Sequence, residues 1–304
     1  MGKAMELRHL RYFVAVAEEL HFGRAAERLG ISQPPLSQQI QALEEELGAR
    51  LLERTNRRVA LTEVGRLFLA EARQVLAQSD KAVQLARRAQ RGEIGELKIG
   101  FTSSAPFTST IPRSIFAFRQ AYPAVHLELL EMSSRQVVAA LQERRVQVGV
   151  IRPLALPEGM ERTELFREPL VAVLRADHPL AQGRDGGIGL AELAEEPFVY
   201  FPVSFGTGLY DQLLELTRQA GFTPRIAQEA GEAMTIIGLV AAGLGVSVLP
   251  ASFRRMRIDG VVFLELLDPG ATSAVWLVRR SRERSPQALA FVELLTREAF
   301  AAAG

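Results

Sequence analysis

The segment HFGRAAERLGISQPPLSQQIQALEEELG, residues 21–48, contains two helix-like patterns separated by a short break. The first pattern is brief and ends at Gly30, a residue type that commonly terminates helices. The second pattern has one continuous apolar face, formed by Leu36, Ile40, Leu43 and Leu47. Two helices joined by a tight glycine-containing turn predict a helix-turn-helix unit.

Two prolines stand at the start of the second helix. Ser32 is expected to precede the helix, so Pro34 and Pro35 lie in its first turn, where a missing N–H costs nothing. The same prolines deprive Ser32 of usual capping partners. Its hydroxyl and the Gln33 amide are therefore available to an external group.

We expect the polar face of this helix to enter a DNA major groove, where Gln and Ser can contact base edges or phosphates. For any single residue of this face, simple exposure to solvent is as good an interpretation as contact with DNA. The residues expected to contact DNA from this helix are Ser32, Gln33, Pro34, Pro35, Ser37, Gln38 and Gln41.

Two short strand-like segments, LLERT and RVAL, follow the second helix and predict a β-wing. The wing carries Arg54, Arg57 and Arg58, and arginines beside a recognition helix suit contact with phosphates or the minor groove. The alternative is a hairpin tip whose arginines are exposed to solvent and do not contact DNA.

A long helical pattern spans residues 62–91, which corresponds to roughly 45 Å. Its thin apolar stripe consists of Phe68, Ala72, Val75, Ser79, Ala82, Ala86 and Ala89. A helix of this length without a core of its own requires a partner helix. We expect the same helix of a second copy, which would give a dimer that reads two DNA half-sites.

The run LRHLRYFVAVAEELHFGRAAERLGISQPPLSQQIQALEEELGARLLERTNRRVALTEVG, residues 7–65, resembles the LysR-type transcriptional regulators. It is most similar to the branch that controls aromatic-compound catabolism through muconate-like inducers, and to activators of acetoin metabolism. The resemblance implies a mainly α winged helix-turn-helix domain, a long α linker helix and a two-lobed α/β effector domain of the periplasmic-binding-protein type. It also implies a tetramer and contact with RNA polymerase.

The expected domain boundaries follow the breaks in pattern. They are residues 1–61 for the winged helix-turn-helix domain, 62–91 for the linker helix and 92–304 for the effector domain. Strand-like and helix-like segments alternate after residue 92, which predicts parallel α/β sheets in two lobes. Lobe I is expected at about 92–166 and 270–304, and lobe II at about 167–269. The cleft between the lobes is the expected ligand site.

Hydroxyl residues follow three expected strands where a helix begins. They occur in GFTSSAP (100–106), EMSSRQ (131–136) and YFPVSFGTG (200–208). Helix N-termini favour carboxylates and phosphates, so we expect a small organic anion there, although each serine could be only an N-cap. With the positions that the resemblance implies, the candidate effector-binding residues are Ser103, Ser104, Ser133, Arg152, Pro202, Ser204 and Phe205. For Arg152, a surface ion pair is the alternative.

The composition limits the remaining possibilities. The chain has no Cys, which excludes disulfides, thiol nucleophiles and Cys-based zinc sites, and its four His show no metal-ligand spacing. We therefore expect no metal and no cofactor other than the effector. No apolar run reaches about 18 residues and no signal-peptide pattern is present, which predicts a cytoplasmic protein without a membrane segment. Residues 1–91 hold 15 Lys and Arg against 11 Asp and Glu, a weak indication of a polyanionic partner.

Three functions compete for this sequence. The first is a ligand-responsive transcription factor that binds double-stranded promoter DNA. The second is a cytoplasmic solute-binding protein with an incidental N-terminal extension, which the specific pattern of residues 7–65 disfavours. The third is an enzyme that uses the cleft, but no nucleophile elbow, P-loop or metal cluster is visible. We therefore expect a regulator rather than an enzyme.

Overall fold

The computed structural model describes residues 5–55, 58–183 and 186–301. The chain divides into two compact units, residues 1–88 and residues 89–304. Arg57 lies outside the described residues, and so does the side chain of Arg58. No helix in the described part of the chain is long and apolar enough to cross a membrane.

The first unit contains the predicted helix-turn-helix. Its helices are α1 (Leu7–Glu19), α2 (Phe22–Leu29) and α3 (Gln33–Leu47). Gly30 ends α2 in the left-handed conformation, as expected of a helix-terminating glycine. Leu36, Ile40 and Leu43 are fully buried against Phe13, whereas Leu47 is 38% exposed. The apolar face of α3 therefore ends one turn earlier than the sequence predicts.

The wing consists of β1 (Leu52–Thr55) and β2 (Arg58–Leu61), paired antiparallel. It leads into the linker helix α4 (Glu63–Gln90). Phe68 packs against Phe13 with tilted rings whose centroids are 5.3 Å apart, and Ala72 is buried, so the first turns of α4 belong to the core of the DNA-binding unit. Further along α4, Val83 and Leu85 are exposed. Of the predicted stripe, Val75, Ala82, Ala86 and Ala89 are exposed and open to a partner helix, whereas Ala72 is buried within the unit.

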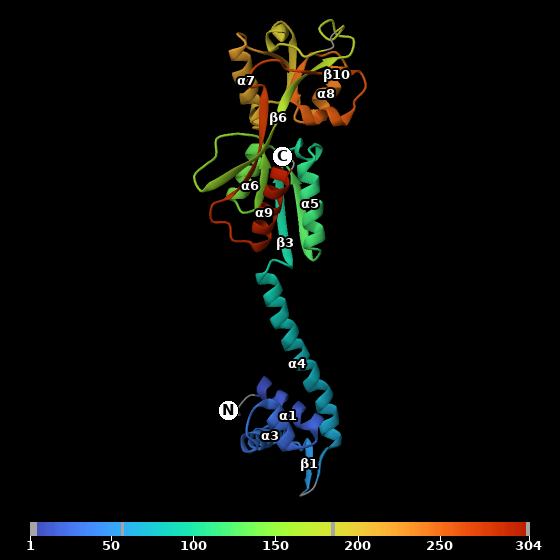
Figure 1. The fold of residues 1–304 in the computed structure, drawn as a ribbon, viewed down its shortest axis with the longest axis vertical. Coiled ribbons are helices and arrows are strands. Elements are labelled where there is room, and N and C mark those ends of the chain that lie inside the picture. The colour runs from blue at the N-terminus through green and yellow to red at the C-terminus, as the bar shows by residue number, and fades with distance from the viewer. Residues whose placement is uncertain (1–4, 56–57, 184–185, 302–304) are drawn as a thin grey trace. The chain divides into compact units, whose positions relative to one another are not determined.

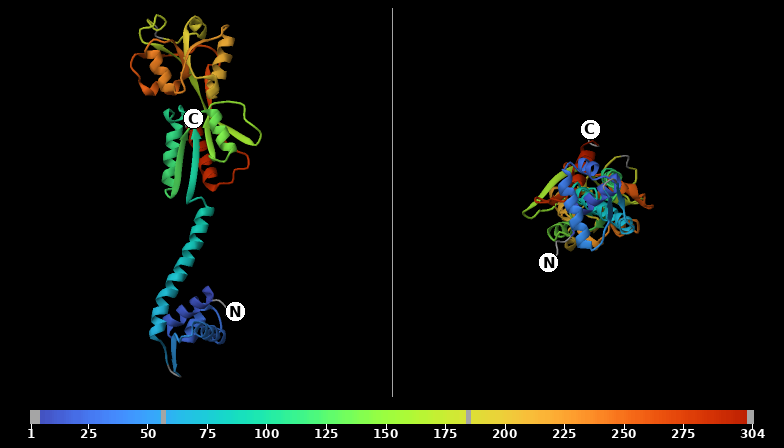
Figure 2. Two further views of the ribbon diagram at one scale, coloured as in Figure 1. Left: turned by 180° about the vertical axis from the view of Figure 1, so that it is seen from behind. Right: turned by 90° about the horizontal axis from the view of Figure 1, so that it is seen from below.

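The second unit has two lobes joined by the long strands β6 and β11, which run side by side between them (Figure 1). Lobe I contains β3 (Gly95–Phe101), α5 (Thr110–Ala121), β4 (Val125–Glu131), α6 (Ser134–Gln142), β5 (Val148–Ile151), β11 (Thr272–Arg280) and α9 (Pro286–Ala301). Strands β3, β4 and β5 pair in parallel, as the alternating pattern predicts. The view from behind shows the same division into two lobes (Figure 2).

Lobe II has a separate core that includes Phe198, Ile236 and Val248. Its elements are β7 (Pro197–Tyr200), α7 (Leu209–Gln219), β8 (Arg225–Glu229), α8 (Ala233–Ala241), β9 (Ser247–Pro250) and β10 (Val261–Glu265). The described part of this unit also contains the 3-10 helices η1 (Ala105–Phe107), η2 (Leu190–Leu193), η3 (Val203–Phe205) and η4 (Ala251–Met256).

The crossover strand β6 (Met160–Arg175) has 16 residues and spans both lobes. Its first part, through Pro169, pairs with β11 in lobe I. Its last part, from Leu170, pairs with β9 and β10 in lobe II. One continuous strand therefore connects the lobes, and the sequence did not indicate this because residues 160–169 are mostly polar and lack the regular apolar alternation of a strand.

Candidate functional site

The start of α3 presents a set of unpaired polar side chains. Ser32 precedes the helix and makes no side-chain capping hydrogen bond, and the prolines occupy the first turn, as predicted. Ser32, Gln33, Pro34, Pro35, Gln38 and Gln41 are exposed, and Ser37 is half-buried. Within the described residues, none of the Ser and Gln side chains of this set makes a hydrogen bond. They are therefore available to an external polar partner.

The opposite side of α3 is anchored by hydrogen bonds. The buried His9 of α1 contacts the Gln39 side chain through Nε2 at 2.9 Å, and its Nδ1 accepts from the Glu6 N–H at 3.2 Å. Glu44 accepts from the backbone N–H groups of Leu51 and Leu52 at 2.8 and 3.0 Å. These contacts fix the helix against α1 and the wing, so its exposed face has a defined orientation.

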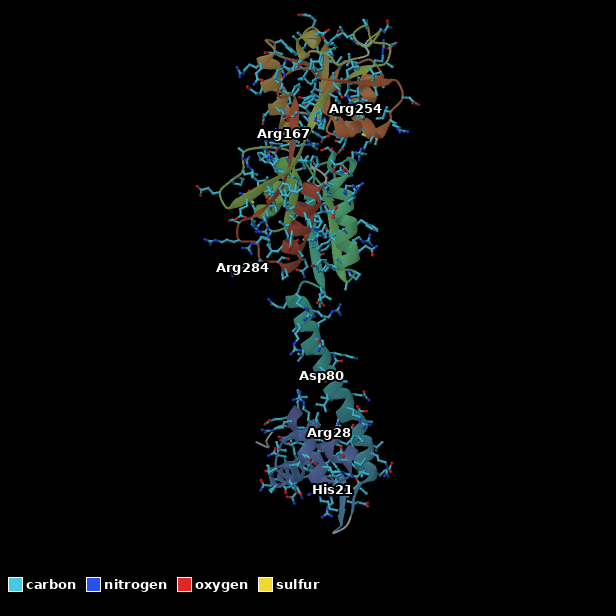
Figure 3. The ribbon with its side chains drawn as sticks, in the orientation of Figure 1. His21, Arg28, Asp80, Arg167, Arg254 and Arg284 are labelled. Carbon is cyan, nitrogen blue, oxygen red and sulfur yellow. The ribbon has the colours of Figure 1, made fainter. Side chains whose placement is uncertain are left out.

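Arg54 of the wing is occupied within the protein. Its guanidinium pairs with Glu44 at 2.7 Å and lies over the Phe22 ring, 5.1 Å from the centroid. The prediction that Arg54 contacts phosphate or the minor groove stays a prediction, and DNA would compete with Glu44 for this guanidinium. Arg28 is similarly paired, with Glu18 at 2.8 Å, and this pairing raises the pKa of Arg28. Figure 3 labels His21 and Arg28 at the two ends of α2.

The second unit contains a cavity of about 180 Å³ between its lobes. From lobe I it is lined by the ends of β3 and β4 and the start of α6. From lobe II it is lined by residues after β7 and before α8. The lining includes Ser103, Ser104, Ser133, Ser134, Arg152, Phe201, Phe205, Thr207, Glu131 and Glu232. Hydroxyl-bearing loops at helix starts thus converge on one cavity, as the sequence predicts.

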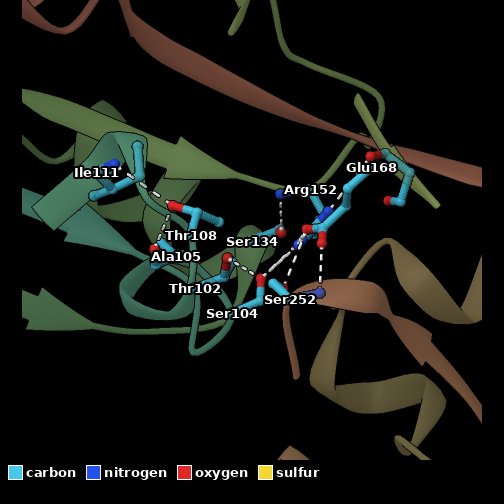
Figure 4. A network of polar contacts seen from close by, with 10 residues as sticks. Thr102, Ser104, Ala105, Thr108, Ile111, Ser134, Arg152, Glu168 and Ser252 are labelled. Carbon is cyan, nitrogen blue, oxygen red and sulfur yellow. Dashed lines mark hydrogen bonds and ion pairs between the residues drawn. The ribbon is translucent and has the colours of Figure 1, made fainter. Parts of the chain in front are cut away.

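Ser104 and Arg152 both line this cavity, and Figure 4 shows the polar contacts that join them. The Ser104 hydroxyl oxygen accepts two hydrogen bonds from Arg152, from Nε at 3.1 Å and from Nη2 at 2.9 Å. A hydroxyl oxygen has two lone pairs, so the remaining contribution of Ser104 is its O–H donor. Its only other neighbour within the network is Thr102 Oγ1, at a long 3.5 Å. Ser104 can therefore offer a proton to a ligand that accepts hydrogen bonds.

Arg152 is buried and connects three parts of the unit. Its guanidinium pairs with Glu168 of β6, and its backbone N–H donates to Ser134 Oγ at 3.1 Å. Glu168 also accepts from the Ser252 N–H of lobe II at 2.7 Å. Burial lowers the pKa of Arg152, and the charge of Glu168 opposes that shift. The network links the cavity wall to the crossover strand and to the second lobe.

Ser133 and Thr207 differ in how their hydroxyls are used. Ser133 caps α6 by accepting from the Gln136 N–H at 3.3 Å, which is the simpler of the two interpretations made from the sequence. Thr207 is 8% exposed, and its Oγ1 is among the buried polar atoms without a hydrogen-bond partner in the described residues. A buried hydroxyl without a partner is unfavourable, so Thr207 is a position where a bound ligand would restore a hydrogen bond.

Comparison with known proteins adds an independent observation. Residues 7–66 match the family described as bacterial regulatory helix-turn-helix protein, lysR family, and residues 90–300 match the LysR substrate binding domain. The chain belongs to the LysR family of transcriptional regulators. The expected winged helix-turn-helix, linker helix and two-lobed α/β effector domain are thereby confirmed.

Relatives and solved structures agree with this assignment. This LysR-type regulator is 55% identical over 288 residues to the HTH-type transcriptional regulator YnfL of Escherichia coli, covering 94% of this chain and 96% of YnfL. It is 39% identical over 281 residues to BenM of Acinetobacter baylyi, covering 92% of each chain. The structure of full-length CbnR complexed with its target DNA is similar at a TM-score of 0.81 and 31% identity, covering 97% of this chain and 100% of CbnR.

The structure of this LysR-type regulator separates the predicted effector residues into two groups. Ser103, Ser104, Ser133, Arg152 and Phe205 line the cavity, whereas Pro202 and Ser204 are not among its lining residues. Residues outside the predicted set also line the cavity, among them Ser134, Thr207, Glu131 and Glu232, and Glu168 supports it through Arg152. Thr207 and Ser134 stand in the loops that the sequence singled out, but Glu168 lies within a strand and carries no local signal.

Proposed function

We propose that this LysR-type regulator binds a small organic carboxylate in the cavity between its lobes, and that the bound ligand changes its action at promoter DNA. The observation that carries this proposal is the state of the Ser104 hydroxyl. Because both of its lone pairs accept from Arg152, it can serve a ligand only as a donor. A carboxylate, which only accepts hydrogen bonds, is the complementary group.

Two further donors support an anionic group at the same place. The Thr207 hydroxyl lacks a partner and lines the cavity. The first-turn N–H groups of a helix have no intrahelical partner. In α6, the N–H of Arg135 donates to Gly206 and that of Gln136 to Ser133, which leaves the N–H of Ser134 for a ligand. The positive end of the α6 dipole adds to the attraction.

The assembly expected from the sequence fits this mechanism. We propose that two copies dimerise through α4, that dimers pair into a tetramer on DNA, and that the cytoplasmic assembly contacts RNA polymerase. A ligand changes such an assembly only if it binds one arrangement more tightly than the other. The Arg152–Glu168–Ser252 network supports this coupling, because it joins the cavity wall to both lobes.

A thermal-shift screen tests the proposal. The screen would use muconates, benzoates, acetate and other small carboxylates on the wild type, on Ser104→Ala and on Thr223→Ala, whose exposed threonine before β8 lies outside the cavity and serves as control. We expect at least one carboxylate to stabilise the wild type and the control but not Ser104→Ala. At a concentration one hundred times Kd, the stabilisation would be about 2.7 kcal/mol. Equal stabilisation of all three proteins would contradict a carboxylate site at Ser104.

A further inference from the structure

A second cavity adjoins the one already described and is more apolar. Its volume is about 440 Å³, and it shares Ser103, Glu131, Glu232 and Phe253 with the first cavity. Its other lining residues include Phe107, Met234 and Met256. An elongated ligand could thus extend from the hydroxyl-lined end, past the two glutamates, into an apolar groove.

The two glutamates come from opposite lobes. Glu131 is the last residue of β4, and Glu232 immediately precedes α8 without a side-chain capping hydrogen bond. Within the described residues neither carboxylate makes a hydrogen bond or an ion pair. Partial burial, followed by the charge of Glu232, raises the pKa of Glu131. The carboxylates therefore repel each other across the cleft, and a cation between them would remove that repulsion.

The other end of the joined cavities favours a negatively charged ligand group. The Thr207 hydroxyl is more than nine-tenths buried and unpartnered, and Ser104 offers an O–H donor. Donors at one end, carboxylates in the middle and apolar side chains beyond them correspond to three groups of one molecule. These groups are a carboxylate, an ammonium and an apolar chain.

We propose that the effector is an amino acid with an apolar side chain, whose carboxylate binds at Ser104 and Thr207 and whose ammonium group lies between Glu131 and Glu232. This inference rests on the proposed function, since it describes the ligand of the same cavity. It disfavours dicarboxylates, because a second carboxylate would face two negative charges. It also gives a cationic partner to two glutamates that have none among the described residues.

Matched ligand sets separate the contributions of the charged groups. Isothermal titration of the full chain would compare L-leucine with 4-methylpentanoate and 3-methylbutylamine, which lack the amino and carboxylate groups respectively. The corresponding aromatic set is L-phenylalanine, 3-phenylpropanoate and 2-phenylethylamine. We expect at least one of the two amino acids to bind about tenfold more tightly than either of its analogues.

Variants of Glu131 and Glu232 test whether these carboxylates cause the preference for the amino acid. In Glu131→Gln and Glu232→Gln, the preference for the amino acid over its desamino analogue should fall about tenfold, partly because the desamino acid binds more tightly. Glu293→Gln, an exposed glutamate of α9 outside both cavities, should retain the wild-type preference.

Each contrary result has a distinct meaning. If the desamino acids bind as tightly as the amino acids, or more tightly, the ammonium site is wrong while the carboxylate proposal stands. If only the amines bind, the carboxylate proposal is wrong as well. If neither amino acid binds, or if the glutamine variants keep the full preference, the inference is overturned.

Discussion

At the scale of single residues, the central feature is the buried charge of Arg152. The Arg152 guanidinium forms an ion pair with Glu168 and donates a hydrogen bond to Ser104. Glu168 in turn accepts a hydrogen bond from the backbone N–H of Ser252. Arg152 could be singled out from the sequence only because the resemblance to LysR-type regulators implied it. Glu168 could not, because its role depends on the register of β6 against the rest of the unit.

The Arg152–Glu168 pair gives a prediction for stability. Glu168→Gln leaves the buried guanidinium without its counter-charge and should lower the free energy of unfolding by about 3 kcal/mol. The double variant Arg152→Met, Glu168→Gln should be more stable than Glu168→Gln alone, because no unpaired charge remains buried. Urea unfolding can be followed by the fluorescence of Trp276, the single tryptophan, which lies in β11 of the same unit. A double variant less stable than Glu168→Gln would refute this account of the pair.

Thr207 gives a second prediction, in which stability and binding move differently. Thr207→Val keeps the shape of the side chain but removes an unpartnered buried hydroxyl. The free energy of unfolding should stay constant or rise by up to about 1 kcal/mol, whereas binding of the carboxylate that stabilises the wild type should weaken. Unfolding by urea and calorimetric titration measure the two effects. A loss of stability with unchanged binding would show that the hydroxyl serves the fold instead.

At the scale of elements, the sequence predicted the helices better than the crossover strand. The cap at Gly30, the prolines at the start of α3 and the alternation of strands with helices are local signals, and the structure confirms each of them. The length of β6 and the presence of β10 depend on pairing between distant segments. The first turns of α4 pack on Phe13 for the same reason, and the stripe alone did not reveal this.

Glu18 connects three helices of the DNA-binding unit and makes its stability depend on pH. It pairs with Arg73 of α4 and Arg28 of α2, each at 2.8 Å. Its pKa is lowered from 4.5, mainly by the hydrogen bond from Arg73 and further by Arg28, against a smaller effect of burial. Because the folded pKa lies below the unfolded value, this stabilisation is present above pH 4.5 and is lost as the pH falls through the folded pKa.

Glu18→Gln tests this connection. The variant should have a lower Tm than the wild type at pH 7, and the difference should shrink as the pH falls below 4.5. Calorimetric melting at several pH values, with Glu45→Gln as an exposed control on α3, provides the measurement. A Tm difference that is constant over this range would mean that the ion pairs do not contribute.

At the scale of the whole molecule, the account joins a DNA-binding unit to a ligand-binding unit in one regulator. The specific run of residues 7–65 allowed both the family and the fold to be predicted, and the comparisons confirm them. We predicted an anionic ligand from three hydroxyl-bearing loops, and this stays a prediction. The two glutamates beside the cavity did not stand out in the sequence, because nothing local distinguishes them from other solvated carboxylates.

The most direct test of the central claim is DNase I footprinting on genomic fragments captured by the full-length protein. The footprint would be recorded with and without the ligand that stabilises the wild type, and again with Ser104→Ala. We predict two protected half-sites whose protection pattern changes with ligand in the wild type and stays constant in Ser104→Ala. An identical wild-type footprint at saturating ligand would contradict the claim that the cavity controls action at DNA.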